Sequence, residues 1–387
     1  MRVLLLPSWY TDENNPLRGI FFKEQAEALE KSGVEVIVLS ITLNDIRKYF
    51  RGEIKKGLEI SIENGVKVYR YNTFNYFPKL QELYFRYYSK LINKLVKFIV
   101  KNEGDIDIVH IHSALDAGIS YSLSDVELPY VITEHSSKYA RNMLNSTQKK
   151  YLPKAFNGAE VVIAVGEGLK KSISKYSNSE KIKIIPNLVK MPNVDFIKEE
   201  NNLENKKIRL FSLGFLTHNK GMDLIIEAYN LGKDKLKDVQ IFIGGSGSEF
   251  ENLRNLIIKY KLEDNIILLG ELNREEVAKN MEACDAFILS SRHETFGIVF
   301  IEAMYYGKPV IASKTGGIET FIDEKCGILV ESGNINEIKN AMINMKENYY
   351  KYDNEFIKDF CKKNFSEEVI ANELISLYRK VISENVT

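Results

Sequence analysis

Short apolar runs alternate along the chain with longer segments in which apolar residues recur every three or four positions. The short runs predict buried strands, and the longer segments predict helices. We expect strands in the first half at residues 3–7, 34–40, 66–71, 108–112, 130–134, 161–165 and 182–185. In the second half we expect them at 208–213, 241–243, 266–269, 286–289, 309–312 and 327–330. Strands that alternate with helices in this way predict an α/β fold with parallel sheets.

The chain of 387 residues is too long for one ordinary hydrophobic core. Its periodic pattern stops near Pro186, and residues 190–207 are polar and charged without a repeat. Such a segment is typical of a domain boundary. We therefore predict one domain over residues 1–187, a second over 188–365, and a helical tail over 366–387.

The most informative stretch runs from residue 285 to 309, where a buried strand is followed by a polar loop and a helix that begins near Gly297. Glu294 lies in the loop and Glu302 in the helix. The backbone amides of Phe296, Gly297 and Ile298 come between them, at the positive end of the helix dipole. Carboxylates accept from hydroxyls and amides donate to anions, so the stretch suits a nucleotide sugar. For either glutamate alone, the alternative is an ordinary solvent-exposed residue.

The two glutamates are separated by seven residues that include Phe-Gly, and Gly-Lys-Pro-Val follows the second one. This pattern resembles the signature of retaining glycosyltransferases of family 4. The resemblance implies the GT-B fold: two facing, doubly wound Rossmann-like domains with a C-terminal helix, here 366–387, that crosses back to the first. It also implies transfer of a hexose-type sugar from a nucleotide-diphosphate donor to a glycan or glycolipid acceptor. UDP is the expected nucleotide and GDP its main competitor.

The resemblance also assigns roles to individual residues. It implies that Glu294, His112 and Lys220 are catalytic. His135 ends the strand that follows that of His112 in the same manner, so we expect it on the acceptor side. The expected donor-binding residues are Gly19, Lys220, Leu272, Glu294, Phe296, Gly297, Ile298 and Glu302. Gly19, Lys220 and the amides are expected at the diphosphate, Glu294 at the sugar, Glu302 at the ribose and Leu272 near the base.

One position departs from the family pattern. Phe215 stands where the family has an arginine that helps Lys220 to neutralise the donor diphosphate. His218 and Arg292 are possible substitutes. Without a substitute, the alternative is a catalytically silent accessory subunit of a glycosyltransferase complex. An epimerase or phosphorylase on the same fold is a third hypothesis.

Histidines end two neighbouring strands. His110 and His112 alternate along one strand, so both point the same way. We interpret His110 as a packing residue and His112 as the one that faces the sugar. Asp105 and Asp107 precede this strand instead of following it, so we do not expect a metal site there, and we expect neither metal nor cofactor dependence.

Charge and composition limit the remaining functions. Lysine plus arginine equals aspartate plus glutamate, 53 each, so nothing indicates nucleic-acid binding. Three widely spaced cysteines suggest neither a disulfide framework nor a zinc site. The apolar runs are strand-sized, and the first is interpreted as a strand and not as a signal peptide. A cytoplasmic protein is the expectation that follows.

A basic helix is expected from residue 81 to 101. Lys90, Lys94, Lys97 and Lys101 form a stripe, and Leu91, Leu95 and Phe98 share an apolar side. Residues 1–101 hold 17 basic against 11 acidic residues, which gives +6. The stripe is either a solvated face or a peripheral contact with an anionic membrane at its inner face.

Overall fold

The computed structural model describes residues 1–12, 15, 18–192 and 207–385. The chain forms two compact units. Unit 1 comprises Met1–Leu188 and Glu367–Thr387, and unit 2 comprises Val189–Ser366. The two boundaries between the units, after Leu188 and after Ser366, each lie one residue later than the boundary expected from the sequence. Most of the aperiodic stretch 190–207 lies outside the described residues.

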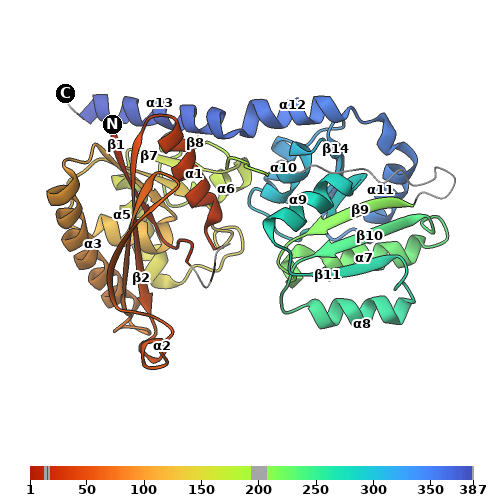
Figure 1. Cartoon of the computed structure of the whole chain (residues 1–387), viewed down its shortest axis with the longest axis horizontal. Coiled ribbons are helices and arrows are strands. Elements are labelled where there is room, and N and C mark those ends of the chain that lie inside the picture. Colours follow the sequence, from red (N-terminus) through yellow and green to blue (C-terminus); the bar gives the residue numbers. More distant parts are fainter. Residues whose placement is uncertain (13–14, 16–17, 193–206, 386–387) are drawn as a thin grey trace. The chain divides into compact units, whose positions relative to one another are not determined.

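Unit 1, which holds the N-terminus of the chain (Figure 1), is built on a sheet with the strand order β3-β4-β2-β1-β5-β6-β7-β8. The strands are β1 (Arg2–Pro7), β2 (Glu35–Asn44), β3 (Gly57–Glu63), β4 (Val66–Phe74), β5 (Ile108–His112), β6 (Tyr130–Glu134), β7 (Val161–Ala164) and β8 (Ile182–Ile184). Neighbouring strands are parallel except β3, which runs antiparallel to β4. The sequence reading missed β3, because this edge strand buries none of its residues and so lacks a clear apolar run.

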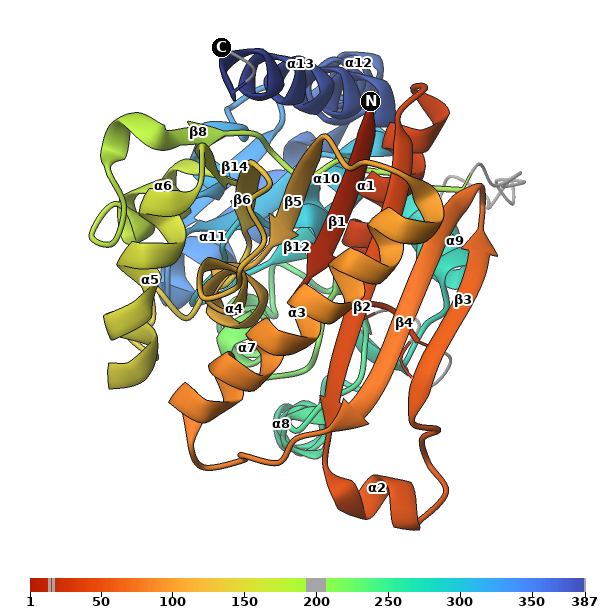
Figure 2. The same ribbon diagram turned by 90° about the vertical axis from the view of Figure 1, so that its left-hand side faces the viewer.

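The helices of unit 1 include the C-terminal one. They are α1 (Ile20–Lys31), α2 (Ile46–Phe50), α3 (Gln81–Glu103), α4 (Ile119–Ser122), α5 (Ser146–Gly158), α6 (Glu167–Ile173) and α13 (Glu367–Asn385). Helix α13 packs against α1, and its Ile370, Leu374 and Tyr378 share one buried core with Phe22 and Leu29. Figure 2 shows α3 lying across one face of the sheet. The helix expected to return to the first domain therefore contributes to the core of unit 1.

Unit 2 holds a parallel sheet with the strand order β11-β10-β9-β12-β13-β14. The strands are β9 (Ile208–Leu213), β10 (Val239–Gly244), β11 (Ile266–Gly270), β12 (Ala286–Leu289), β13 (Val310–Lys314) and β14 (Gly327–Glu331). The helices are α7 (Met222–Gly232), α8 (Phe250–Tyr260), α9 (Arg274–Ala283), α10 (Ile298–Tyr305), α11 (Ile335–Asn348) and α12 (Asn354–Phe365). This is the Rossmann order, and the α/β fold expected from the sequence is confirmed.

The strand order reverses between β9 and β12 in unit 2 and between β1 and β5 in unit 1. Open α/β sheets bind ligands at the carboxyl ends of the strands beside such a reversal. The loops that leave β9 and β12 carry Lys220 and Glu294, and β5 ends at His112. The topology therefore brings these predicted residues to the expected position in each unit.

Candidate active site

The loop after β12 ends in a helix N-terminus with free donors. Gly297 caps α10 with φ 80°, in the left-handed region that favours glycine, and no side chain caps this end. A Cβ at Gly297 would lie 2.8 Å from Phe300 Cδ2 and 3.2 Å from Glu294 Cγ. Within the described part of the chain, the amides of Phe296, Gly297 and Ile298 donate no hydrogen bond. Three donors at the positive end of a helix can bind an anion.

Lys220 and Glu294 form an ion pair in unit 2. Lys220 Nζ lies 2.6 Å from Glu294 Oε2, and the side chains are 23% and 13% exposed. The other carboxylate oxygen of Glu294 accepts from the amide of Thr295 at 3.2 Å. We expected these residues to bind different parts of the donor, the diphosphate and the sugar. The structure brings them together, which the sequence reading did not predict.

A second ion pair holds the β9 and β12 loops together. Both terminal nitrogens of Arg292 donate to Asp223, at 2.8 and 2.5 Å, and Arg292 also donates to the carbonyl of His218 at 2.7 Å. Burial alone would raise the pKa of Asp223, but the hydrogen bonds from Arg292 lower it below its usual value. Ser290 Oγ donates to the carbonyl of Gly221 at 2.8 Å, close to the same place. These contacts fix the turn that carries Lys220.

These contacts leave both candidate substitutes for the missing arginine as predictions. Arg292 is paired with Asp223, so it could serve the diphosphate only by giving up part of that pairing. Phe215 is 70% exposed and supplies no cation. His218 is exposed and stays a candidate substitute.

Glu302 and Leu272 are two further residues that the sequence predicts to bind the donor. Burial raises the pKa of Glu302 to about 7, and the positive charge of Arg274 offsets part of that rise. Leu272 packs against Gly244, where an added Cβ would lie 2.6 Å from Leu272 Cδ1. Their contacts with ribose and base stay predictions.

His110 is a packing residue, as predicted. It is fully buried, with Nδ1 2.5 Å from Tyr378 Oη and Nε2 2.7 Å from Thr133 Oγ1. Tyr378 belongs to α13, so the pair attaches the C-terminal helix to the sheet of unit 1. Burial lowers the pKa of His110 to about 3, so the ring is neutral at physiological pH.

His112 and His135 meet at the carboxyl ends of β5 and β6. His112 Nδ1 lies 3.3 Å from His135 Nε2, and their other ring nitrogens are buried without a hydrogen-bond partner in the described structure. Burial lowers the pKa of both rings, that of His135 to about 3. Glu134 holds the adjoining loops by accepting from the amide of Ala114 at 2.8 Å and from Tyr139 Oη at 2.7 Å. Two neutral imidazoles with unused polar atoms can bind hydroxyl groups.

Gly19 stands at the junction expected for it. It precedes α1 with φ 77°, and a Cβ there would lie 3.0 Å from Phe22 Cδ2 and 3.1 Å from Trp9 Cδ1. A side chain larger than hydrogen would therefore disturb this turn. The proximity of Gly19 to a donor diphosphate stays a prediction.

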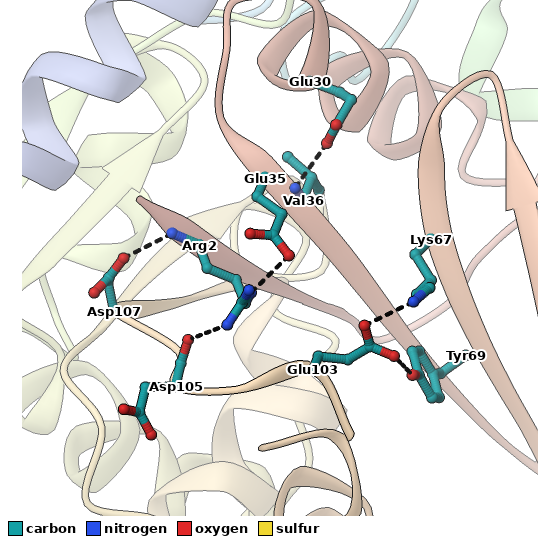
Figure 3. Close-up of polar contacts among 9 residues, drawn as sticks. All are labelled: Arg2, Glu30, Glu35, Val36, Lys67, Tyr69, Glu103, Asp105 and Asp107. Atoms are coloured by element: carbon teal, nitrogen blue, oxygen red, sulfur yellow. Dashed lines mark hydrogen bonds and ion pairs between the residues drawn. The ribbon is translucent and has the colours of Figure 1, made fainter. Parts of the chain in front are cut away.

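Asp105 and Asp107 lie just before β5 and contact Arg2 of β1, at the edge of the sheet opposite His112 and His135. The amide of Arg2 donates to Asp107 Oδ2 at 2.7 Å, and its guanidinium donates to the carbonyl of Asp105 at 2.8 Å (Figure 3). They precede β5, as expected. Within the described ranges, no group of three or more histidines, cysteines and acidic residues is placed to hold a metal ion.

Helix α3 differs from its prediction in one respect. The lysines of the stripe face solvent, and Leu91 and Leu95 are buried, but Phe98 is 40% exposed. Phe98 therefore lies outside the buried face of α3 to which we assigned it. The buried face covers fewer residues than the spacing of apolar residues predicted. No helix in the described residues is both long and apolar enough to cross a membrane.

Comparisons with known proteins find matches over both units of the chain. The model for "Glycosyltransferase Family 4" matches residues 19–191, and that for "Glycosyl transferases group 1" matches residues 193–361. An uncharacterized glycosyltransferase of Methanocaldococcus jannaschii is 32% identical over 287 residues, which are 72% of this chain and 77% of the relative. The chain belongs to glycosyltransferase family 4. The family and the GT-B fold inferred from the sequence are thereby confirmed, and the protein is a glycosyltransferase.

Two further similarities describe related glycosyltransferases. The alpha-monoglucosyldiacylglycerol synthase of Streptococcus pneumoniae is 22% identical over 320 residues, which are 75% of this chain and 68% of the synthase. The Anabaena protein HepE, solved in complex with UDP and glucose, aligns with a TM-score of 0.72 at 18% identity and covers 98% of this chain and 100% of its own. The comparisons do not favour the alternative of a silent accessory subunit.

Proposed function

We propose that this family 4 glycosyltransferase is a retaining enzyme that transfers a hexose-type sugar from a UDP-linked donor. The acceptor is a glycan or a lipid-linked glycan at the cytoplasmic face of a membrane, in the synthesis of a bacterial surface polysaccharide or glycolipid. The observation that carries the proposal is the Lys220–Glu294 ion pair, whose glutamate lies against Gly297 and its free amides. A UDP donor is supported by HepE, and a lipid acceptor by the synthase of Streptococcus pneumoniae.

Donor binding would exchange the partners of this ion pair. The diphosphate would accept from Lys220 and from the amides of residues 296–298, since both are donors that favour an anion. Lys220 would then leave Glu294, whose carboxylate becomes free to accept from the sugar hydroxyls. Ionised Glu302 would accept from the ribose hydroxyls. One donor molecule would thus provide partners for Lys220, for Glu294 and for the three free amides of residues 296–298.

The proposed reaction breaks the bond between the anomeric carbon and the departing phosphate oxygen. An acceptor hydroxyl forms the new bond from the same side, and its proton passes to the departing phosphate. Negative charge grows on the diphosphate in the transition state, where Lys220 and the helix amides stabilise it. Glu294 acts by orienting the sugar and not as a covalent nucleophile. His112 as a sugar-facing residue and His135 as an acceptor-side residue remain predictions for unit 1.

We further propose that turnover requires no metal ion, because Lys220 and the amides supply the electrostatic stabilisation. Turnover that persists in excess EDTA would support this, and restoration only by added Mg²⁺ or Mn²⁺ would contradict it.

A panel of nucleotide sugars tests the function directly. We expect one UDP-sugar to raise the melting temperature by mass action, and to release UDP when lipid-linked acceptors are added. The matched control is the same assay with Lys220→Met, which should lose the shift. Binding without release under any acceptor would instead support the accessory subunit, and the absence of binding would contradict the nucleotide-sugar site.

A further inference from the structure

Helix α2 exposes apolar side chains that the glycosyltransferase reaction does not explain. None of its five residues is buried, and Ile46, Tyr49 and Phe50 are 44%, 45% and 78% exposed. Figures 1 and 2 both show α2 beyond the carboxyl ends of β2 and β4. A contiguous exposed apolar surface on a protein commonly marks a contact with a membrane or another molecule.

The exposed surface continues from α2 onto the end of β4. The ring of Tyr49 lies 5.2 Å from that of Phe74, which in turn lies 5.9 Å from that of Tyr76. Tyr76 is itself 51% exposed. We call Ile46, Tyr49, Phe50 and Tyr76 the α2 face. It belongs entirely to unit 1.

Uncompensated positive charge surrounds the α2 face. Residues 45–56 contain five basic and two acidic residues, a net charge of +3. Arg47 pairs with Asp45 and Arg51 with Glu53, so both acidic residues are engaged. The remaining basic residues are Lys48, Lys55 and Lys56, all exposed and, within the described residues, without an ion pair. Lys56 Nζ lies 4.9 Å from the centre of the Phe74 ring.

We infer that the α2 face docks on an anionic lipid surface. Aromatic side chains favour the headgroup level of a bilayer, and neighbouring lysines are attracted to acidic headgroups. The lysine stripe of α3, for which the sequence left a membrane contact open, has the charge, but of the three apolar residues assigned to its apolar side only Phe98 is exposed, at 40%. The α2 face has both positive charge and four exposed apolar or aromatic side chains.

This placement bears on the acceptor. β2 and β5 both run parallel to β1, so α2 follows its strand at the same edge of the sheet as His112. A membrane contact at α2 would therefore bring the histidine edge of unit 1 toward lipid. The inference goes beyond the proposed donor chemistry and depends on neither the donor sugar nor its nucleotide.

Vesicle sedimentation without donor tests the inference. We expect the full chain to sediment with phosphatidylcholine vesicles that contain phosphatidylglycerol, and not with phosphatidylcholine alone. The double variant Y49S/F50S should lower the partition coefficient at least about tenfold. The variant K48Q/K55Q/K56Q should lower it by up to about a hundredfold, since each lysine near an anionic surface is worth roughly a factor of five.

Two variants with equally exposed residues serve as controls. Ile62→Ser removes a side chain that is 71% exposed on β3, and K90Q/K94Q/K97Q removes three lysines of the α3 stripe. Both should bind vesicles like the wild type. The donor-induced melting shift should be unchanged in all four variants, so failure here is distinguishable from failure of the proposed function.

Three results would overturn the inference. Wild-type protein that stays in the supernatant with anionic vesicles would exclude the lipid contact. Loss of binding in the α3 variant with full binding in Y49S/F50S would place the contact on α3. A wild-type dimer that Y49S/F50S converts to a monomer in light scattering would show that the α2 face joins two copies of the chain.

Discussion

The ion pair between Lys220 and Glu294 gives the sharpest test of the donor site. At 2.6 Å the gross Coulomb attraction is about 6 kcal/mol for an effective dielectric constant of 20. Desolvation of two side chains that are 23% and 13% exposed offsets most of it. We expect a net coupling of about 1 to 2 kcal/mol in the ligand-free protein. The donor must compensate for this amount when it separates the pair.

The two residues should differ in what their loss does to binding and turnover. Lys220→Met should weaken UDP binding by about 30- to 150-fold, because the diphosphate loses a charge-assisted donor worth roughly 2 to 3 kcal/mol. Glu294→Gln should leave UDP affinity unchanged or raise it a few fold, since Lys220 no longer has a competing partner. The same variant should lower kcat by about two orders of magnitude or more, because the sugar is no longer oriented.

Calorimetric titration with UDP, urea unfolding and single-turnover transfer measure these quantities. A double-mutant cycle isolates the coupling: the unfolding free energies of the two single variants should not add in K220M/E294Q. The reasoning is refuted if Glu294→Gln weakens UDP as much as Lys220→Met does. Additive unfolding free energies would show that the pair does not stabilise the ligand-free loops.

The rest of the site makes three further predictions. Gly297→Ala should abolish donor binding and lower the free energy of unfolding by about 2 kcal/mol in urea. The control is Gly333→Ala, where φ is 81° but no atom lies within 4 Å of an added Cβ. It should lower the free energy of unfolding by only about 1 kcal/mol, the cost of a left-handed backbone. Asp223→Asn should lower kcat about tenfold or more and the free energy of unfolding by roughly 2 kcal/mol, because it leaves Arg292 without its carboxylate partner. Activity equal to that of the wild type would show that the Arg292–Asp223 ion pair does not position Lys220. Because the pKa of Glu302 is raised from 4.5 to about 7, affinity for an intact nucleotide sugar should rise from pH 6 to pH 8. The free energy of unfolding should fall as the pH rises from 4.5 to about 7, where the folded protein holds a proton that the unfolded chain has lost, and should level off above that. Glu302→Gln should flatten both dependences.

The parts that the sequence predicted well are local in the chain. The buried strand β12, the loop with Glu294, the glycine at the turn and the helix α10 follow one another directly in the chain. The strand gives way to the helix where the spacing of apolar residues changes from that of a strand to that of a helix. His112 was distinguished from His110 by two equally local features, its place at the end of β5 and a motif that resembles the family's, and its role stays a prediction.

The parts that the sequence did not predict depend on partners far apart in the chain. Arg292 and Asp223 are 69 residues apart, and Lys220 and Glu294 are 74 apart, so only the folded loops reveal that they pair. Burial is equally nonlocal. Phe98 fits the spacing of apolar residues in α3, yet it is 40% exposed, because the buried face of α3 does not extend to it. The raised pKa of Glu302 likewise follows from packing around α10 and not from its motif.

The departure at Phe215 has a physical consequence for the way the leaving group is stabilised. An arginine at this position would share the diphosphate with Lys220, but Phe215 is exposed and Arg292 is held by Asp223. Lys220 is paired with Glu294 before the donor binds. Part of the free energy of its interaction with the donor therefore only replaces that of the Glu294 ion pair. The amides of residues 296–298 have no partner to give up within the described structure, and they are fixed by the backbone. Preorganised donors of this kind lose little when charge develops beside them. Under the proposed function, we therefore expect the N-terminus of α10 to supply a larger share of the transition-state stabilisation than the cationic side chains do.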